Sequence, residues 1–299
     1  MTAIGHVAAA LHRAGVSAAY PELPAGRLEQ FPKERSATPA DAPSNGWSAA
    51  MLDIERLAIP GGLPDSVAEQ YRRIAAALHQ AQRTRQLRVL MVTSAVAGEG
   101  KTLTAANVAL TLSAAFHRRV LLVDSDLRRP MMHTLFGIPG TPGLIDALRS
   151  GRSATADLPV VRISPALSVL TAGRPEQDSL GRLASPALGA LLSNAADRHD
   201  WVVVDTPPAM LLSETRLLAD TADGTLLVLR ADATQHPIVA RAIELIGRER
   251  IVGVVLNGAE RRAVHAAYGG DYYEHYARRS RGDRPSVSTG AGSPSGDAV

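Results

Sequence analysis

The sequence predicts an α/β fold, a doubly wound and mostly parallel sheet with helices on both faces. Three observations lead to this prediction. Short apolar segments alternate with helix-like segments along the chain. These segments consist mostly of apolar residues, as expected for strands that are buried on both faces of a sheet. Hydrophobic residues make up 45% of the 299 residues but Phe, Trp and Tyr only 4%, so the expected core is aliphatic.

The expected elements follow one another from residue 65. A first helix is predicted over residues 65–83, where Val67, Tyr71, Ile74 and Leu78 recur at intervals of three or four. Six strands are predicted over residues 87–93, 120–123, 167–170, 201–204, 224–229 and 251–256. Helices are expected between them, over residues 101–116, 143–148, 186–196 and 237–248. This strict alternation is typical of βαβ units.

Composition divides the chain into three parts. Residues 1–50 are predicted to form a flexible N-terminal extension, with one short helix over residues 5–13 and then proline-rich sequence. Packing of this extension on the domain as irregular coil is the alternative. Residues 51–262 are expected to form the α/β domain. Residues 263–299 are expected to form a largely disordered tail that contains a tyrosine cluster.

Charge and composition exclude several classes of function. The formal net charge is +3, which is too mild to indicate a nucleic-acid partner. The chain has no cysteine, which excludes a disulfide framework, a cysteine-ligated cluster and a cysteine nucleophile. No apolar run approaches the length of a membrane span, and the N-terminus lacks a signal-peptide core. We therefore expect a cytoplasmic protein.

A glycine-bearing loop joins the first strand to the next helix with the spacing of a phosphate-binding loop. It reads Ala-Val-Ala-Gly-Glu-Gly-Lys-Thr from Ala95 to Thr102. Gly98 and Gly100 allow backbone N–H groups to turn toward phosphate oxygens. Lys101 can bridge the outer phosphates, and the Thr102 hydroxyl can bind Mg²⁺. An ordinary strand-to-helix turn is the alternative, and the Gly-Lys-Thr spacing between an apolar strand and an apolar helix argues against it.

Three carboxylates follow predicted strands. Asp124 and Asp126 come after the second strand, and Asp205 comes after the fourth. Ligands of doubly wound sheets lie beyond the carboxyl ends of the strands, so these side chains should emerge near the loop. Carboxylates there can hold Mg²⁺ or accept a proton from an attacking hydroxyl. Any one of them could instead cap a helix, but their combination with the loop favours a site for nucleotide and metal.

With these motifs, residues 51–276 resemble the bacterial protein-tyrosine kinases of capsule and exopolysaccharide systems. That family is built on a P-loop ATPase core related to the MinD and ParA proteins. Residues 95–102 resemble its Walker A loop, and residues 121–130, which include Arg128-Arg129-Pro130, resemble its A-prime motif. Residues 202–208 resemble its Walker B motif, and residues 253–257 resemble the strand whose Asn contacts adenine.

The resemblance implies a role for each site residue. Lys101 would stabilise the transferring phosphate of ATP, and Thr102 and Asp205 would hold Mg²⁺ with help from Asp124. Asp126 is the hypothesis for the group that receives the tyrosine proton, with Asp124 as the alternative. The residues implied in nucleotide binding are Ala97, Gly98, Glu99, Gly100, Lys101, Thr102, Leu103 and Asn257.

Four of the six tyrosines lie close together in the tail, at Tyr268, Tyr272, Tyr273 and Tyr276. A loose tail that packs one or two rings on the domain is one interpretation. The resemblance favours another, in which these tyrosines are phosphate acceptors for an adjacent subunit of a homo-oligomer. It further implies a membrane polysaccharide co-polymerase or adaptor as activator, a cognate tyrosine phosphatase, and a location at the inner face of the membrane through that partner.

The predicted function is an ATP-dependent tyrosine autokinase that regulates polysaccharide biosynthesis and export. One alternative is a MinD- or ParA-like ATPase switch, although those proteins carry a lysine at the position of Val96. Another is a catalytically weak, nucleotide-dependent scaffold. Two further departures from the family pattern are visible. The assembly motif Glu-x-x-Arg-x-x-Arg has Ala75 after Glu69 and Arg72, with Arg73 as a substitute, and the loop has Ala95 and Ala97 where the family commonly has Gly and Pro.

Overall fold

The computed structural model describes residues 56–58, 62–150, 158–174, 180–183, 185–211 and 215–259. The predicted N-terminal extension, its short helix over residues 5–13 and the tyrosine cluster of the tail lie outside the described residues. The predicted domain of residues 51–262 is described over most of its length.

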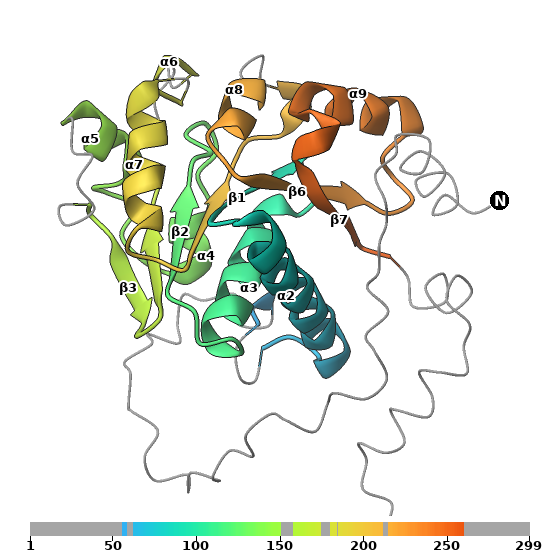
Figure 1. Ribbon diagram of the computed structural model, residues 1–299, viewed down its shortest axis with the longest axis horizontal. Coiled ribbons are helices and arrows are strands. Elements are labelled where there is room, and N and C mark those ends of the chain that lie inside the picture. The colour runs from blue at the N-terminus through green and yellow to red at the C-terminus, as the bar shows by residue number, and fades with distance from the viewer. Residues whose placement is uncertain are drawn as a thin grey trace, which may run out of the picture. The chain divides into compact units, whose positions relative to one another are not determined.

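A seven-stranded sheet forms the centre of the described structure, in the order β3-β4-β2-β5-β1-β6-β7 (Figure 1). The strands are β1 (Val89–Ser94), β2 (Val120–Asp124), β3 (Val161–Ser164), β4 (Leu167–Leu170), β5 (Trp201–Asp205), β6 (Gly224–Arg230) and β7 (Ile251–Asn257). All neighbouring pairs are parallel except β3 and β4. The predicted doubly wound, mostly parallel sheet is confirmed.

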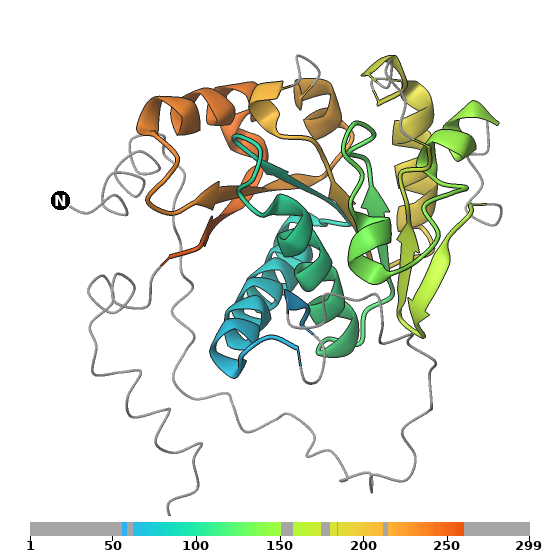
Figure 2. The same cartoon turned by 180° about the vertical axis from the view of Figure 1, so that it is seen from behind.

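Helices cover both faces of this sheet, as Figures 1 and 2 show from opposite sides. On one face lie α2 (Asp65–Arg85), α3 (Lys101–Ala114) and α4 (Met132–Phe136). On the other lie α5 (Leu144–Arg149), α6 (Leu180–Leu183), α7 (Pro186–Ala196), α8 (Thr215–Asp220) and α9 (His236–Ile246). Short 3₁₀ turns follow β5 and α9, as η4 (Ala209–Leu211) and η5 (Arg248–Arg250).

The two faces carry separate hydrophobic cores, because neighbouring residues of a strand point to opposite sides. Leu90 and Val92 of β1 pack with α2 and α3 in one core. Val89 and Met91 pack in the other core, which contains the apolar residues of α5, α7 and α9. Every residue of β1, β2 and β5 is buried, which explains why each of these strands begins with four apolar residues in succession.

The structure adds short elements that were not predicted. The edge strand β3 is antiparallel to β4, and its four residues are only partly buried, so it lacks the apolar signature of the central strands. Helices α4, α6 and α8 have four to six residues, too few to display a helical period. Helix α9 ends earlier than predicted because Gly247 follows it with φ of 91°.

No helix in the described ranges is both long and apolar enough to pass through a bilayer.

Candidate active site

The loop between β1 and α3 has the backbone geometry that its glycines allow. Gly98 and Gly100 have φ of 85° and 90°, a left-handed region that favours glycine. Helix α3 begins at Lys101, and the N–H of Thr104 donates to the carbonyl of Gly100 at 2.9 Å. The amides of Lys101, Thr102 and Leu103 precede this first helical bond, so they are oriented toward the loop as an anion site requires.

Asn257, at the end of β7, packs directly against this loop. Its amide nitrogen donates to the carbonyl of Glu99 at 2.9 Å. A side chain at Gly100 would overlap the Asn257 amide. Glycine is therefore required at position 100 both by its backbone angle and by the space that Asn257 occupies.

The side chain of Glu99 is buried and fixes the loop to the end of β6. It is 2% exposed. One carboxylate oxygen accepts from the Val96 N–H at 2.8 Å, and the other accepts from the Arg230 N–H at 3.1 Å. The Thr234 hydroxyl donates to that second oxygen as well. Glu99 was predicted as part of the nucleotide loop, but this role of its side chain was not.

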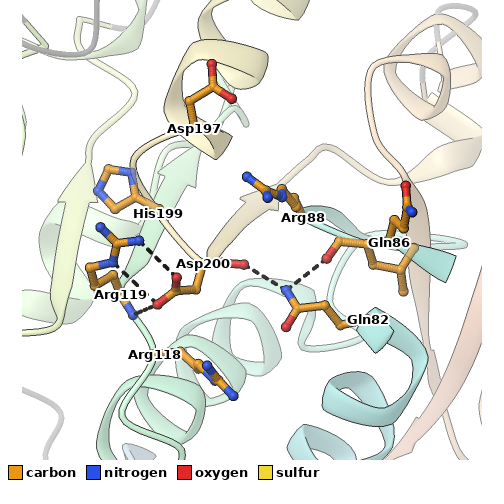
Figure 3. A pocket seen from close by; sticks show the side chains of 9 residues that line it. Gln82, Gln86, Arg88, Arg118, Arg119, Asp197, His199 and Asp200 are labelled. Carbon is orange, nitrogen blue, oxygen red and sulfur yellow. Dashed lines mark hydrogen bonds and ion pairs between the residues drawn. The ribbon is translucent and has the colours of Figure 1, made fainter. Parts of the chain in front are cut away.

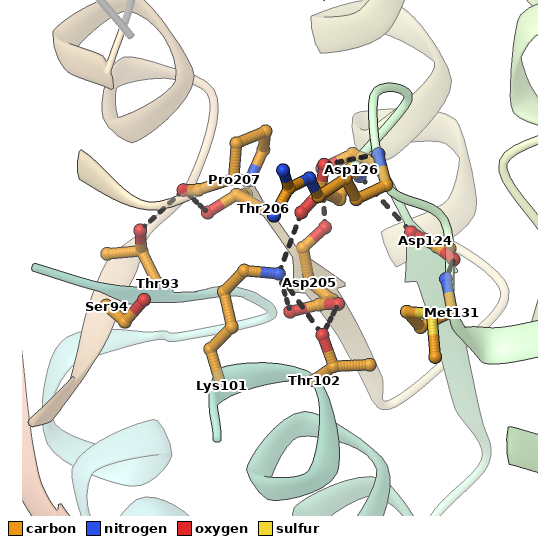
Figure 4. A network of polar contacts seen from close by, with 12 residues as sticks. Thr93, Ser94, Lys101, Thr102, Asp124, Asp126, Met131, Asp205, Thr206 and Pro207 are labelled. Carbon is orange, nitrogen blue, oxygen red and sulfur yellow. Dashed lines mark hydrogen bonds and ion pairs between the residues drawn. The ribbon is translucent and has the colours of Figure 1, made fainter. Parts of the chain in front are cut away.

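The three predicted carboxylates meet at the carboxyl ends of the central strands (Figure 4). Strands β2 and β5 are neighbours, with Asp124 and Asp205 paired in register. Asp126 lies just beyond the end of β2, and its N–H donates to Asp124 Oδ1 at 3.2 Å. Lys101 reaches this group from α3, with its Nζ 2.9 Å from Asp126 Oδ2 and 3.5 Å from Asp205 Oδ1.

Thr102 and Asp205 form a donor set that fits Mg²⁺. The Thr102 hydroxyl donates to Asp205 Oδ2 at 2.7 Å. Asp205 Oδ1 is buried and accepts no hydrogen bond from the described residues, and its charged neighbour is Lys101 Nζ at 3.5 Å. The described ranges contain no complete cage of three or more acidic, His or Cys side chains. Mg²⁺ does not need one, because it commonly binds one or two carboxylates, waters and substrate phosphates.

The Asp124 carboxylate accepts hydrogen bonds from the backbone of the segment that follows β2. Its Oδ2 accepts from the N–H groups of Met131 and Met132 at 3.1 and 3.0 Å, where α4 begins. Asp124 therefore holds the chain where it enters α4, through the N–H groups of Met131 and Met132. It can still reach a metal through water, since a carboxylate accepts about four hydrogen bonds.

Charge and burial set the protonation of this cluster. Burial, followed by the charge of Asp205, raises the pKa of Asp124 to about 7. Burial also raises the pKa of Asp205 to about 6, although Lys101 opposes the shift. Burial acts to lower the pKa of Lys101, but the charges of Asp205 and Asp126 outweigh it and raise that pKa. The Lys101 ammonium group is therefore stabilised in its charged form, whereas burial opposes ionisation of Asp124 and Asp205.

Sequence similarity to known proteins shows the family of this chain. A family model described as "Cellulose biosynthesis protein BcsQ" matches residues 87–250, more than half of the chain. The tyrosine-protein kinase YwqD of Bacillus subtilis is 34% identical over 208 residues, which cover 69% of this chain and 86% of that protein. The chain belongs to the bacterial protein-tyrosine kinase family. It is an enzyme of that family with a nucleotide-binding P-loop fold.

Two further relatives are similar to this chain over part of their own length. The succinoglycan biosynthesis transport protein ExoP of Rhizobium meliloti is 30% identical over 217 residues, 71% of this chain but only 27% of that protein. The solved kinase domain of the tyrosine kinase Etk of Escherichia coli has 28% identity and a TM-score of 0.60, over 65% of this chain and 76% of that chain. This chain therefore spans about a quarter of the length of ExoP.

The residues that resemble part of the family's assembly motif lie on α2. Glu69 pairs with Arg72 at 3.0 Å and with Arg73 at 3.7 Å, and all three side chains are about half exposed. Ala75 is fully buried in the core that α2 forms with α3. An arginine could not occupy position 75 without repacking, so Arg73 is the cation that remains on this surface beside Arg72.

A pocket lies at the opposite ends of the strands from this site, where β1, β2 and β5 begin (Figure 3). Several of its polar groups pair with one another, although the buried Nε of Arg118 has no hydrogen-bond partner among the described residues. Arg119 pairs with Asp200 at 3.0 Å. The Gln82 amide donates to the carbonyls of Leu87 and Asp200 at 2.9 and 2.8 Å. None of the predicted site residues lines this pocket, and its contacts join strand starts rather than form a reactive centre.

Proposed function

We propose that this chain is an ATP-dependent tyrosine autokinase that phosphorylates Tyr268, Tyr272, Tyr273 and Tyr276 of a neighbouring copy. The observation that supports it is the convergence of Lys101, Thr102, Asp126 and Asp205 at the end of a left-handed glycine loop. A phosphate-binding loop, a lysine and a carboxylate pair are the parts that phosphoryl transfer requires.

The residues of the loop would bind and orient ATP. The first amides of α3 and the loop of Ala97 to Gly100 face the phosphates. Lys101 stabilises the charge that develops on the transferred group. Thr102 and Asp205 would hold Mg²⁺, which neutralises phosphate charge, with Asp124 acting through water. Asn257, whose amide donates to the carbonyl of Glu99 beside the loop, would contact the base, as the resemblance implies.

Asp126 is proposed to receive the proton of the attacking tyrosine. A free tyrosine has a pKa of about 10, so attack at neutral pH requires a nearby acceptor. Asp126 is 6% exposed whereas Asp124 is fully buried, and Asp124 already accepts three backbone hydrogen bonds. Access therefore favours Asp126, and Asp124, whose pKa burial raises to about 7, is the alternative acceptor.

The proposed partners follow from the relatives. ExoP is named for succinoglycan biosynthesis and transport, which supports a role in exopolysaccharide or capsule biosynthesis and export. We propose activation by a membrane co-polymerase or adaptor, assembly as a homo-oligomer through α2, and reversal by a cognate tyrosine phosphatase. The partner would hold the chain at the cytoplasmic face of the membrane.

The first test is a phosphotyrosine map. The purified chain is incubated with Mg²⁺-ATP, and its peptides are read by mass spectrometry beside a Lys101→Ala control. We expect phosphate on Tyr268, Tyr272, Tyr273 and Tyr276 in the unsubstituted chain alone, with a rate per chain that rises with concentration because transfer occurs between copies. If ATP binds but no tyrosine is labelled, even with the partner's cytoplasmic segment added, the switch or scaffold function replaces the kinase.

A further inference from the structure

Arginines gather where the parallel strands begin, at the opposite strand ends from the candidate active site. The turns that lead into β1, β2, β5, β6 and β7 are residues 83–88, 117–119, 197–200, 221–223 and 247–250, here called the strand-start turns. They contain eight arginines but only four carboxylates. Because the five strands are parallel in one sheet, all these turns lie at the same end of it. Positive charge is therefore concentrated there.

Ion pairs neutralise few of these arginines. Among the described residues, Arg119 and Arg250 pair with carboxylates. Two carboxylates of the turns are engaged elsewhere, since Glu249 pairs with Arg216 and Asp223 accepts from two backbone N–H groups. The arginines that form no ion pair within the described ranges are Arg83, Arg85, Arg88, Arg118, Arg198 and Arg248. Five of these six are exposed and Arg118 is partly buried, so their charges can attract an external anion.

A pocket of about 670 Å³ lies among these turns, and Arg88, Arg118 and Arg119 line it (Figure 3). Within the described residues, the Arg118 guanidinium contacts His79 Nε2 at 3.3 Å and no carboxylate. Arg88 Nη1 donates to the carbonyl of Ala196 at 3.0 Å. A guanidinium group carries five N–H donors in a planar fork that fits phosphate oxygens. The pocket therefore has the room and the donors to hold a phosphate group.

The surroundings of this pocket favour a lipid phosphate over other polyanions. No Phe, Tyr or Trp lines the pocket, so it offers none of the rings on which nucleic-acid bases usually stack. None of the six large hydrophobic side chains exposed in the described ranges belongs to a strand-start turn, whereas a protein interface usually has an apolar centre. An anionic membrane needs neither feature, because it attracts arginine electrostatically.

We propose that the strand-start turns lie against an anionic membrane, and that Arg88 and Arg118 hold a lipid phosphate in the pocket that they line. The exposed arginines of the other turns supply the surrounding attraction. The candidate active site lies at the opposite strand ends, so this contact leaves it open to ATP. The inference goes beyond the proposed function, in which a partner protein supplies the membrane location, and it requires no phosphoryl transfer.

Vesicle sedimentation tests this contact with the full chain and no partner protein. We expect the chain to bind vesicles with about 30% phosphatidylglycerol but not pure phosphatidylcholine, and to be released at about 1 M salt. The face variant, Arg85→Gln with Arg198→Gln, should lower the partition coefficient at least about tenfold, since each arginine near an anionic surface contributes about fivefold.

The matched control is Arg128→Gln with Arg241→Gln. It removes the same charge from two exposed arginines that lie outside the strand-start turns. It should change the partition coefficient by less than about twofold, because the attraction decays within about a Debye length of the membrane surface.

The pocket is tested separately by Arg88→Gln with Arg118→Gln. At constant ionic strength, inorganic phosphate should displace the unsubstituted chain from the anionic vesicles more strongly than chloride does. This variant should lose that difference, because its pocket no longer holds phosphate. If thermal unfolding shows that it does not fold, Arg118→Lys replaces it, since lysine keeps the charge but not the planar fork.

The outcomes decide each part of the inference. Equal binding to neutral vesicles, or an equal loss in the face variant and its control, would overturn the membrane contact. Tighter binding to a short DNA duplex than to anionic vesicles at the same salt would assign the turns to nucleic acid instead. Phosphate competition that survives in the pocket variants would overturn the roles of Arg88 and Arg118. Absence of tyrosine transfer would overturn the kinase function and leave these expectations intact.

Discussion

Lys101 contacts one carboxylate that ends β5 and another that follows β2. This contact distinguishes the neighbouring aspartates from one another. Its ammonium group lies 2.9 Å from Asp126 and 3.5 Å from Asp205. Asp124 is tied instead to backbone amides that begin α4. The two aspartates that flank Ser125 therefore differ in kind. Asp126 faces the reactive lysine, whereas Asp124 also organises the polypeptide around it.

Replacing each aspartate by asparagine should separate these roles. We expect Asp126→Asn to lower kcat for tyrosine transfer by about 10²–10⁴-fold, the usual contribution of a proton acceptor, with little change in melting temperature. Asp124→Asn should lower the melting temperature, because one amide oxygen cannot replace a carboxylate that accepts three backbone bonds. Single-turnover transfer and thermal unfolding measure the two effects. Undiminished transfer by Asp126→Asn would assign the proton to another group.

At the scale of elements, Glu99 joins the phosphate loop to β6 and to the segment before α9. Its carboxylate accepts from Val96, Arg230 and Thr234, and its carbonyl accepts from Asn257 of β7. The loop is thus fixed to two strand ends rather than to its own helix alone. Preorganised amides bind an anion without reorganisation at the moment of transfer.

Glu99→Gln should loosen that loop, because an amide presents a donor to groups that are themselves donors. Unsatisfied buried polar groups cost about 1–3 kcal/mol, so we expect the Kd for an ATP analogue to rise about tenfold while the fold is retained. Glu244→Gln on α9 is the control, since Glu244 is 66% exposed and pairs only at the surface. Equal nucleotide affinity in both variants would contradict the role assigned to Glu99.

Much of the fold was predictable from sequence because its central strands are buried on both faces. The runs around Leu90, Leu122 and Val203 contain no polar residue, and buried parallel strands require this. The antiparallel strand β3 was missed because an edge position leaves Val161 and Ile163 partly exposed. Short helices such as α8 owe their existence to tertiary packing rather than to a periodic sequence.

The site was predictable where topology alone brings residues together. Asp124 and Asp205 end neighbouring parallel strands, so their convergence with Lys101 follows from the fold. The partners of Glu99 were not predictable, because Arg230 and Thr234 lie more than 130 residues away in sequence. No spacing rule relates such positions, and only the packed structure shows their contact.

For the whole molecule, the buried carboxylates make stability depend on pH. The pKa of Asp124 is raised to about 7 and that of Asp205 to about 6, against about 3.9 in an unfolded chain. Between about pH 4 and pH 7 the folded state therefore binds more protons than the unfolded state, and this contribution to stability is lost as pH rises.

We expect Asp205→Asn to remove part of this dependence. In metal-free buffer the variant and the unsubstituted chain should melt at similar temperatures at pH 5, where Asp205 is protonated. At pH 8 the variant should gain about 3 °C or more relative to the unsubstituted chain, since it no longer buries that charge. A constant difference in melting temperature across this range would contradict the raised pKa of Asp205.

The contact between Gly100 and Asn257 has an evolutionary consequence. A residue other than glycine at position 100 meets two independent obstacles, the φ of 90° and the amide of Asn257. Shortening Asn257 removes only the second obstacle, and it also removes the bond to Glu99. A lineage that loses this glycine must both accept a strained backbone and displace the Asn257 side chain, so recovery of the activity is expected mainly by reversion to glycine.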